Sequence, residues 1–329
     1  MCNVVNFGAK PAPHNSTVAV AAAIAACCQA DPANALIIPA GVYISGPQVV
    51  RKCSNLTLQF DGQLQAPASI SDWPSLDVKQ FLLADDSPGL SITGQGSING
   101  SGSEWWAIRK KTPSHPAPYL VRIDGCNGSS ISNVRLIDSP KFHMVVDNSW
   151  DIDIDGISVH APSDSPNTDG IDLGNSHRVN VRGVTVANGD DGVAIKAFTT
   201  AVLVENCTFY GGHGTSIGSL GETSDGDYVE DIAFRNCTFH GSEIGTRVKT
   251  WQGRTGHVRN ITFEDVVLHQ VQLPIRINQY YCPHSQHPGD CVNSTTKGLN
   301  ISGVTFRRLT GTQTSGYAGA LLCSDPAPC

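Results

Sequence analysis

The chain has 329 residues, a formal net charge of −7 and only 16% charged residues. An acidic chain has no general electrostatic attraction for nucleic acids or anionic membranes, so we expect neither as a partner. The 33 Gly and 19 Pro, beside 40% hydrophobic residues, indicate many turns around a sizeable core and argue against a helical bundle. We therefore expect a single domain over residues 1–329, and an acidic substrate would need local positive charge at its site.

The first 50 residues or so are predicted to form an N-terminal cap. The alanine-rich run Val18–Cys28 favours a helix, which Ser16 or Thr17 can begin. The run is too short for a membrane span and lacks the basic leader of a signal sequence. We expect this helix to cover the open end of a sheet.

From about residue 50, short segments of alternating β-branched residues recur at intervals typical of stacked repeats. The connections between them are too short and too polar for strand–helix–strand crossovers. The segments are Asn55–Phe60, Leu90–Thr93, Ser130–Ile137, Asp151–Val159, Arg178–Val186, Ala201–Phe209, Tyr228–Phe239, His257–Leu268 and Leu299–Phe306.

No single repeat of this kind can bury its own hydrophobic face, so the repeats must stack on one another. An all-β, single-stranded, right-handed parallel β-helix fits this requirement, with neighbouring strands about 4.8 Å apart. A β-sandwich is the alternative, but it would need hairpin turns such as Asn-Gly between neighbouring strands, and these do not recur systematically here. The spacing predicts the β-helix, closed at its N-terminal end by the helix described above.

The cysteine content indicates an oxidising compartment, because eleven Cys are many for a cytosolic protein. N-x-S/T acceptor triplets for N-glycans recur along the chain and agree with secretion to the extracellular space or cell wall. The odd count leaves at least one thiol unpaired. The pairs that spacing favours are Cys282 with Cys291, Cys323 with Cys329, and Cys2 with Cys27 or Cys28.

Four polar clusters fall on successive repeats, and a tyrosine follows them. Asp169 and Asp190 are 21 positions apart and Asp190 and His213 are 23 apart, each close to one short coil, so they should line one face. The clusters are Asn167-Thr168-Asp169, Gly189-Asp190-Asp191, Gly212-His213-Gly214 and Arg247-Val248-Lys249, followed by Gln279-Tyr280-Tyr281.

These residue types suit hydrolysis of a glycosidic bond, which needs a protonated acid at the leaving oxygen and a base at a water molecule. Close carboxylates raise the pKa of one of them, and the glycines beside Asp190 and Asp191 permit a turn that brings both to one side. Arg247 and Lys249 share one face of a strand and can bind the carboxylate of a uronic acid. No zinc or calcium motif is present, so we expect no metal and no cofactor.

In this order, and over nearly the whole chain, the motifs resemble those of the polygalacturonases of glycoside hydrolase family 28. The resemblance implies a pectin-lyase-like β-helix and hydrolysis, with inversion, of the α-1,4-galacturonosyl linkages of polygalacturonate or pectin by a monomer. The matching stretches are Ser165–Ile171, Gly189–Asp191, Gly212–Ser219 and Arg247–Trp251, followed by Gln279 and Tyr281.

By the same resemblance, Asp190 is the general acid, and Asp169 and Asp191 are the pair that activates water. His213 assists near the acid, and Asn167 positions the site. The residues expected to bind the substrate are Asn167, Arg247, Lys249, Tyr281 and Gln279.

Two departures from the family pattern stand out. Family members usually carry a disulfide directly after the paired Asp, and this chain has Gly192 and Phe209 at those two positions. Both cysteines are replaced together, which indicates a lost disulfide and not a damaged site. Family chains also tend to continue past the position of Cys329, so a final coil is expected to be missing.

Other functions stay open at this point. A pectate lyase would share the fold and substrate but would depend on calcium and leave unsaturated ends, whereas a non-catalytic cell-wall-binding β-helix would not need all of the polar clusters. Between endo and exo action, compact length and the short Glu222–Tyr228 connection favour endo, with an exo-polygalacturonase as the alternative.

Overall fold

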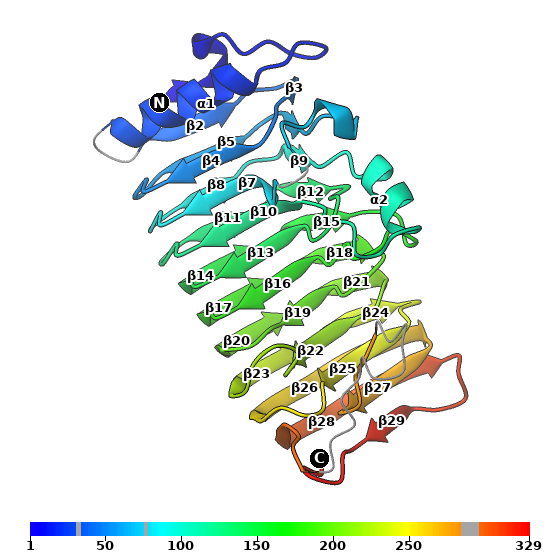
Figure 1. Cartoon of the computed structure of the whole chain (residues 1–329). Coiled ribbons are helices and arrows are strands. Elements are labelled where there is room, and N and C mark those ends of the chain that lie inside the picture. The colour runs from blue at the N-terminus through cyan, green and yellow to red at the C-terminus, as the bar shows by residue number, and fades with distance from the viewer. Residues whose placement is uncertain (31–33, 76–77, 284–295) are drawn as a thin grey trace.

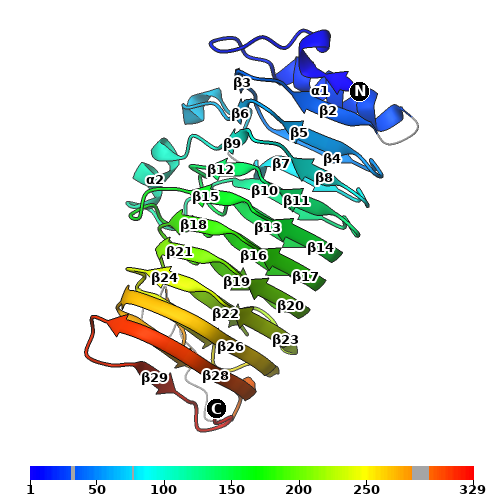
Figure 2. The ribbon, with the colours of Figure 1, turned by 180° about the vertical axis from the view of Figure 1, so that it is seen from behind.

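The computed structural model describes residues 1–30, 34–75, 78–283 and 296–329. These residues wind into a stack of parallel coils with the two termini at opposite ends (Figures 1 and 2). The helix α1 (Thr17–Gln29) lies over the first coil, which confirms the predicted capping helix. A second α-helix, α2 (Ser103–Arg109), was not predicted, and two turns of 3-10 helix span Val4–Phe7 and Ile70–Asp72.

Three columns of parallel strands build the coils, as predicted for a parallel β-helix. The first column is a sheet of ten strands in the described residues. Its strands are β4 (Gln48–Arg51), β7 (Gln80–Asp85), β10 (Tyr119–Asp124), β13 (Met144–Asp147), β16 (Ile171–Gly174), β19 (Val193–Ile195), β22 (Thr215–Leu220), β25 (Ile244–Thr250), β27 (Leu273–Asn278) and β29 (Gly319–Leu322).

The other two columns are joined into one sheet, because the long strand β26 (Gly256–Val271) pairs with members of both. One consists of β1 (Cys2–Asn3), β2 (Ala35–Ile38), β5 (Thr57–Phe60), β8 (Ser91–Thr93), β11 (Ser130–Ser132), β14 (Trp150–Asp155), β17 (His177–Arg182), β20 (Thr199–Glu205), β23 (Asp227–Arg235), β26 and β28 (Asn300–Gln313). The other consists of β3 (Val42–Ile44), β6 (Gln63–Gln65), β9 (Ser97–Asn99), β12 (Arg135–Ile137), β15 (Ser158–His160), β18 (Thr185–Asn188), β21 (Thr208–Gly211), β24 (Thr238–His240) and β26.

Strand alternation explains how the coils stack. In β14, Ile152 and Ile154 point into the core while Asp151 and Asp153 face solvent. Equivalent inward positions of successive coils lie directly over one another, so that aliphatic and aromatic side chains form continuous columns. One such column is Phe234, Phe263 and Phe306, whose rings are stacked at 4.9 and 5.3 Å.

The position of the missing family disulfide is filled by an aromatic ring. A Cβ atom on Gly192 would lie 2.4 Å from Cδ1 of Phe209, so only glycine fits there. Phe209 is itself fixed, since it is buried and stacks on Phe239 at a centroid distance of 4.9 Å. Van der Waals contact therefore takes the place of a covalent bond under the turn that carries Asp190 and Asp191.

Disulfides tie the two ends of the described chain. They are Cys2–Cys27, Cys28–Cys53 and Cys323–Cys329. Of the two partners predicted for Cys2, the structure has Cys27. Cys282 is also disulfide-bonded, and its predicted partner Cys291 lies outside the described residues. Free buried thiols are Cys126, Cys207 and Cys237.

No helix in the described ranges is long and apolar enough to cross a membrane.

Candidate active site

The predicted acids and His213 gather at the turns that enter successive strands of the ten-stranded sheet, and Arg247 and Lys249 lie within its strand β25. Asp169, Asp191 and His213 each lie two residues before the mutually paired positions of β16, β19 and β22. Backbone hydrogen bonds hold these turns in register: the Gly170 N–H donates to the Asp191 carbonyl at 2.8 Å, and the His213 N–H donates to the Asp190 carbonyl at 2.8 Å. Neighbouring coils thus bring the three acids and the histidine to one place.

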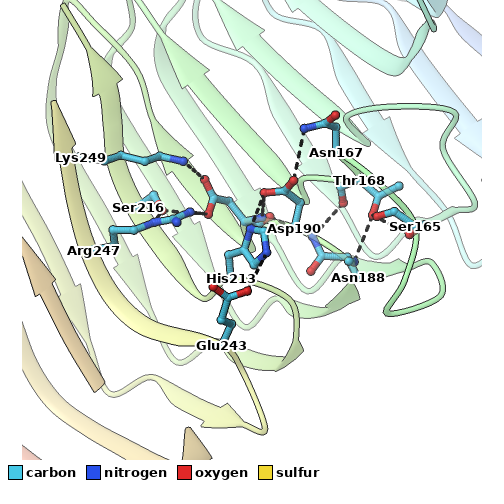
Figure 3. Close-up of polar contacts among 12 residues, drawn as sticks. Ser165, Asn167, Thr168, Asn188, Asp190, His213, Ser216, Glu243, Arg247 and Lys249 are labelled. Carbon is cyan, nitrogen blue, oxygen red and sulfur yellow. Dashed lines mark hydrogen bonds and ion pairs between the residues drawn. The ribbon is translucent and has the colours of Figure 1, made fainter. Parts of the chain in front are cut away.

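Asp190 is held by three donors (Figure 3). Its Oδ1 accepts from the backbone N–H of Asp191 at 2.8 Å and pairs with Nδ1 of His213 at 2.9 Å. Within the described residues its Oδ2 accepts from Nδ2 of Asn167 alone, at a longer 3.3 Å. Oδ1 is therefore fully engaged, and Oδ2 is the oxygen that remains available to a substrate.

His213 lies between two carboxylates. Its Nε2 is 3.3 Å from a carboxylate oxygen of Glu243, opposite the contact with Asp190. Burial lowers the pKa of His213, but the hydrogen bond and the charge of Asp190 outweigh burial, and the net pKa is raised. The imidazole thus keeps its second proton, and with it a positive charge beside Asp190, to higher pH than a free histidine.

Asp191 lies behind the others and has no exposed surface. It accepts from Lys249 at 2.7 Å, from Ser216 at 2.9 Å and from Arg247. Burial would raise the pKa of this carboxyl, but the charges of Lys249 and Arg247 outweigh it and hold the pKa far below the ordinary range. Asp191 is therefore ionised, and two cations against one anion leave this cluster with a net positive charge.

Asp169 has the opposite electrostatic environment. It is 4% exposed, and its Oδ1 has no hydrogen-bond partner among the described residues. Burial first, and then the charge of Asp190, raise its pKa well above the usual value for an aspartate. The two outer members of the predicted acid trio, Asp169 and Asp191, thus differ sharply in how readily they take up a proton.

A cavity of about 300 Å³ joins most of these groups. Neither Asp191 nor Gln279 is among its walls. The predicted residues that line it are Asn167, Asp169, Asp190, His213, Arg247, Lys249 and Tyr281, and the unpredicted ones are Phe142, Lys196, Ser219, Glu222, Trp251 and Pro283.

The structure places Gln279 away from the cavity. Its Nε2 donates to the carbonyls of Leu299 and Ala327, both at 2.7 Å, and its Oε1 accepts from the N–H of Ser324 at 2.8 Å. The side chain is 1% exposed, so all of its hydrogen-bonding capacity serves to hold the C-terminal segment. Its expected role in substrate binding was taken from the family resemblance.

Lys196 and Asp172 are additions that the sequence analysis missed. Their charged groups lie 3.6 Å apart, with the Asp172 side chain buried and that of Lys196 partly exposed, and both groups act on the pKa of Asp169. Burial lowers the pKa of Lys196, but the surrounding carboxylates, Asp172 first, outweigh burial and raise it. Alternation along β16 would have placed Asp172 on a cavity-facing side, but a single charge within a strand gives no sign of its partner.

Asp172 gives the fold a pH dependence that can be measured. Burial raises its pKa from 3.8 to about 6, with Lys196 opposing the change. Because the folded state binds this proton more tightly than the unfolded state, the contribution is fully present below pH 3.8 and is lost as pH rises through 6. In urea unfolding, the free energy of unfolding of Asp172→Asn, relative to that of the parent, should therefore rise between pH 4 and 7 by about 3 kcal/mol. A constant difference across that range would contradict this assignment.

One group of three described residues could in principle hold a metal ion, because ligand atoms of Asp190, Asp191 and His213 lie within 4.8 Å of one another. The oxygens of Asp191 are, however, already engaged by Lys249, Arg247 and Ser216. A divalent cation there would face two like charges at close range. The donor set does not fit a metal site.

The cavity on this parallel β-helix is lined by the carboxyl groups of Asp169 and Asp190, by the imidazole that contacts Asp190, and by the cations Arg247 and Lys249. This arrangement is typical of a polysaccharide-cleaving enzyme. Residues 28–329 match the model of the family described as Glycosyl hydrolases family 28. The chain belongs to glycoside hydrolase family 28.

Curated relatives agree with this membership, and solved structures share the fold. The chain is 33% identical to a polygalacturonase of Malus domestica, over 99% of this chain and 72% of that protein. It is 34% identical to an exopolygalacturonase of Platanus acerifolia, over 99% of this chain and 86% of that protein. In fold it is similar to an endo-xylogalacturonan hydrolase from Aspergillus tubingensis (TM-score 0.85, 24% identity, covering 100% of this chain and 90% of that one). A polygalacturonase from Erwinia carotovora gives a TM-score of 0.75 at 24% identity, covering 97% and 96% of the two chains.

Proposed function

We propose that this enzyme hydrolyses the α-1,4-galacturonosyl linkages of polygalacturonate, the pectin backbone, by an inverting mechanism and in the endo mode. The observation that carries the proposal is that two carboxyl groups, Asp190 and Asp169, line one cavity. Oδ2 of Asp190 accepts from Asn167 at a long 3.3 Å, and the buried Oδ1 of Asp169 has no hydrogen-bond partner among the described residues. Inversion needs one carboxyl group as acid and a second as base on the other side of the sugar. The net positive cluster of Arg247, Lys249 and Asp191 supplies the charge that a galacturonate carboxylate requires.

In this mechanism Asp190 donates the proton on Oδ2 to the glycosidic oxygen as the bond to the anomeric carbon breaks. The leaving sugar departs as an alcohol, and Asp190 becomes a carboxylate that His213 and the Asp191 N–H stabilise at Oδ1. Water attacks the anomeric carbon from the opposite face, and Asp169 takes its proton. The raised pKa of Asp169 makes it an effective base once it is ionised.

Of the pair Asp169 and Asp191, we propose that Asp169 is the base that takes the proton of the attacking water. Asp191 lies within 4.8 Å of Asp190, whereas inverting acid and base groups are usually about 6.5–9.5 Å apart to leave room for water. Its strongly lowered pKa also makes it a weak base. Asp191 instead holds Arg247 and Lys249 in place, and its negative charge helps to orient the attacking water.

Aromatic side chains complete the binding surface for the sugar. Lys249 Nζ lies 5.2 Å from the ring centroid of Tyr281, and Tyr281 meets Trp251 edge to face at 6.1 Å. The indole N–H of Trp251 has no partner in the described part of the chain, although the residue lines the cavity. A sugar ring on Tyr281 would thus lie beside an aromatic neighbour, Trp251, with the ammonium group of Lys249 close by.

Endo action is supported by hollows that continue beyond the catalytic cavity. A second cavity of about 460 Å³ shares His213 with the first, and a third of about 410 Å³ shares Glu243 and Gln272 with the second. A polymer needs such an extended surface to bind in its middle. The disulfides support action outside the cell, in the cell wall or surrounding medium.

The first products released from polygalacturonate test the whole proposal. Proton NMR recorded before mutarotation should show the β-anomer at the new reducing end, because inversion converts the α-linkage. Sizing of the same samples should show mixed oligomers from the start. The rate should be the same with and without a chelator of divalent cations, since the site does not fit a metal.

Three results would redirect the assignment. A first-formed α-anomer would contradict inversion, and monomer alone at early times would indicate exo action. Unsaturated ends with a calcium requirement would place the enzyme with the lyases.

A further inference from the structure

The short helix α2 carries an arginine under the catalytic turn. Trp105 and Trp106 of α2 are 1% and 8% exposed and anchor the helix against the coils. Arg109, the last residue of α2, is 5% exposed and does not line the catalytic cavity. It is therefore placed to contact the site from behind, not to contact the substrate.

The guanidinium of Arg109 links α2 to the general acid through one amide. It donates to Oδ1 of Asn167 and to the carbonyl of His115, while Nδ2 of Asn167 donates to Oδ2 of Asp190 at 3.3 Å. Its Nε has no partner among the described residues. A buried guanidinium with an unpaired N–H lowers the stability of the fold. The presence of Arg109 is therefore better explained by its contact with Asn167 than by a contribution to stability.

The chemistry of the two side chains fixes the orientation of the amide. Arginine has donors and no acceptor, so Asn167 must turn its oxygen to Arg109 and its NH₂ group to Asp190. A donor then occupies the Asn167 side of Oδ2. A proton on Oδ2 cannot point at Asn167 and is left to face the cavity.

We propose that Arg109 is a positioning residue, which keeps Asn167 as a donor toward Asp190 and so directs the acid proton to the leaving oxygen. Without Arg109 the amide can turn over, and its carbonyl can accept that proton in an internal hydrogen bond. The proposal rests on the proposed role of Asp190 as general acid.

The test compares Arg109→Met, Asn167→Ala and the double variant on polygalacturonate. Arg109→Met should lower kcat about tenfold, the scale of one charge-assisted hydrogen bond, with KM unchanged. In the Asn167→Ala background the same substitution should have no further effect, because the two residues act as one unit. Lys110→Met is the matched control: it removes the neighbouring surface contact of α2 with Asp164 and should leave kcat unchanged.

The leaving group separates proton delivery from a general loosening of the site. On an oligogalacturonosyl fluoride, whose leaving group needs little protonation, the loss in Arg109→Met should shrink to less than about threefold. If Arg109→Met does not fold, Arg109→Gln fills the same space without enforcing the amide orientation and should give the same pattern.

Equal losses on both substrates, a loss that persists in Asn167→Ala, or an equal loss in Lys110→Met would each overturn the proposal. These outcomes differ from failure of the proposed function itself, which would show as an unchanged polygalacturonate rate in Asp190→Asn.

Discussion

Asp190→Asn should lower kcat on polygalacturonate by at least about a hundredfold, the lower end of what general acid catalysis contributes. The amide keeps the size of the carboxyl group and can still contact His213 and Asn167, but it has no acidic proton for the leaving oxygen. The substrate should bind almost normally, because Arg247, Lys249 and Tyr281 are untouched. Steady-state kinetics, with calorimetric binding of an oligogalacturonate, measure both quantities.

The matched control is Asp153→Asn, an exposed acid on β14 remote from the cavity, which should leave kcat unchanged. An Asp190→Asn enzyme that keeps more than about a tenth of the parent rate would show that another group protonates the leaving oxygen.

Asp191→Asn should destabilise the fold by about 3–5 kcal/mol, because it removes one partner of a buried charge cluster. Arg247 and Lys249 are only 7% and 5% exposed and would be left as two buried cations side by side. Activity should fall as well, since the cavity-facing ends of both cations depend on this anchor. Urea unfolding followed by circular dichroism gives the change in stability.

Removing one of the two cations tests whether repulsion between them causes the loss of stability in Asp191→Asn. Adding Lys249→Met to Asp191→Asn should recover part of the lost stability, because the surviving Arg247 then has no like charge beside it. The surface ion pair of Asp151 with Arg178 offers a comparison, and Asp151→Asn there should change little. Equal effects of Asp151→Asn and Asp191→Asn would contradict the view that burial makes the difference.

The spacing of β-branched segments was enough to predict the β-helix, because each coil repeats the same inward pattern. It also brought Asp169, Asp190, Asp191 and His213 together, since residues one coil apart must lie side by side. What the spacing could not show was how deeply each acid is buried and which charges surround it. Asp169 and Asp191 look equivalent in the sequence, yet only Asp191 is paired with buried cations, which come from β25, two coils further on.

Features outside the repeat were also beyond prediction. The helix α2 lies in an excursion between two coils, so no periodicity pointed to Arg109 beneath Asn167. Gln279 differs from its expected role, because a motif resemblance carries no information about the direction in which one side chain points. Its contacts with the C-terminal segment depend on residues twenty and more positions away.

The contact between Gly192 and Phe209 constrains how such a site can evolve. A cysteine at position 192 alone would meet the Phe209 ring, and a cysteine at position 209 alone would leave a hollow where the ring now packs. Each single step towards the family disulfide is therefore harmful, although the two steps together would restore a matched pair. The relation is reciprocal sign epistasis: two compatible solutions under one catalytic turn, with no neutral single substitution between them.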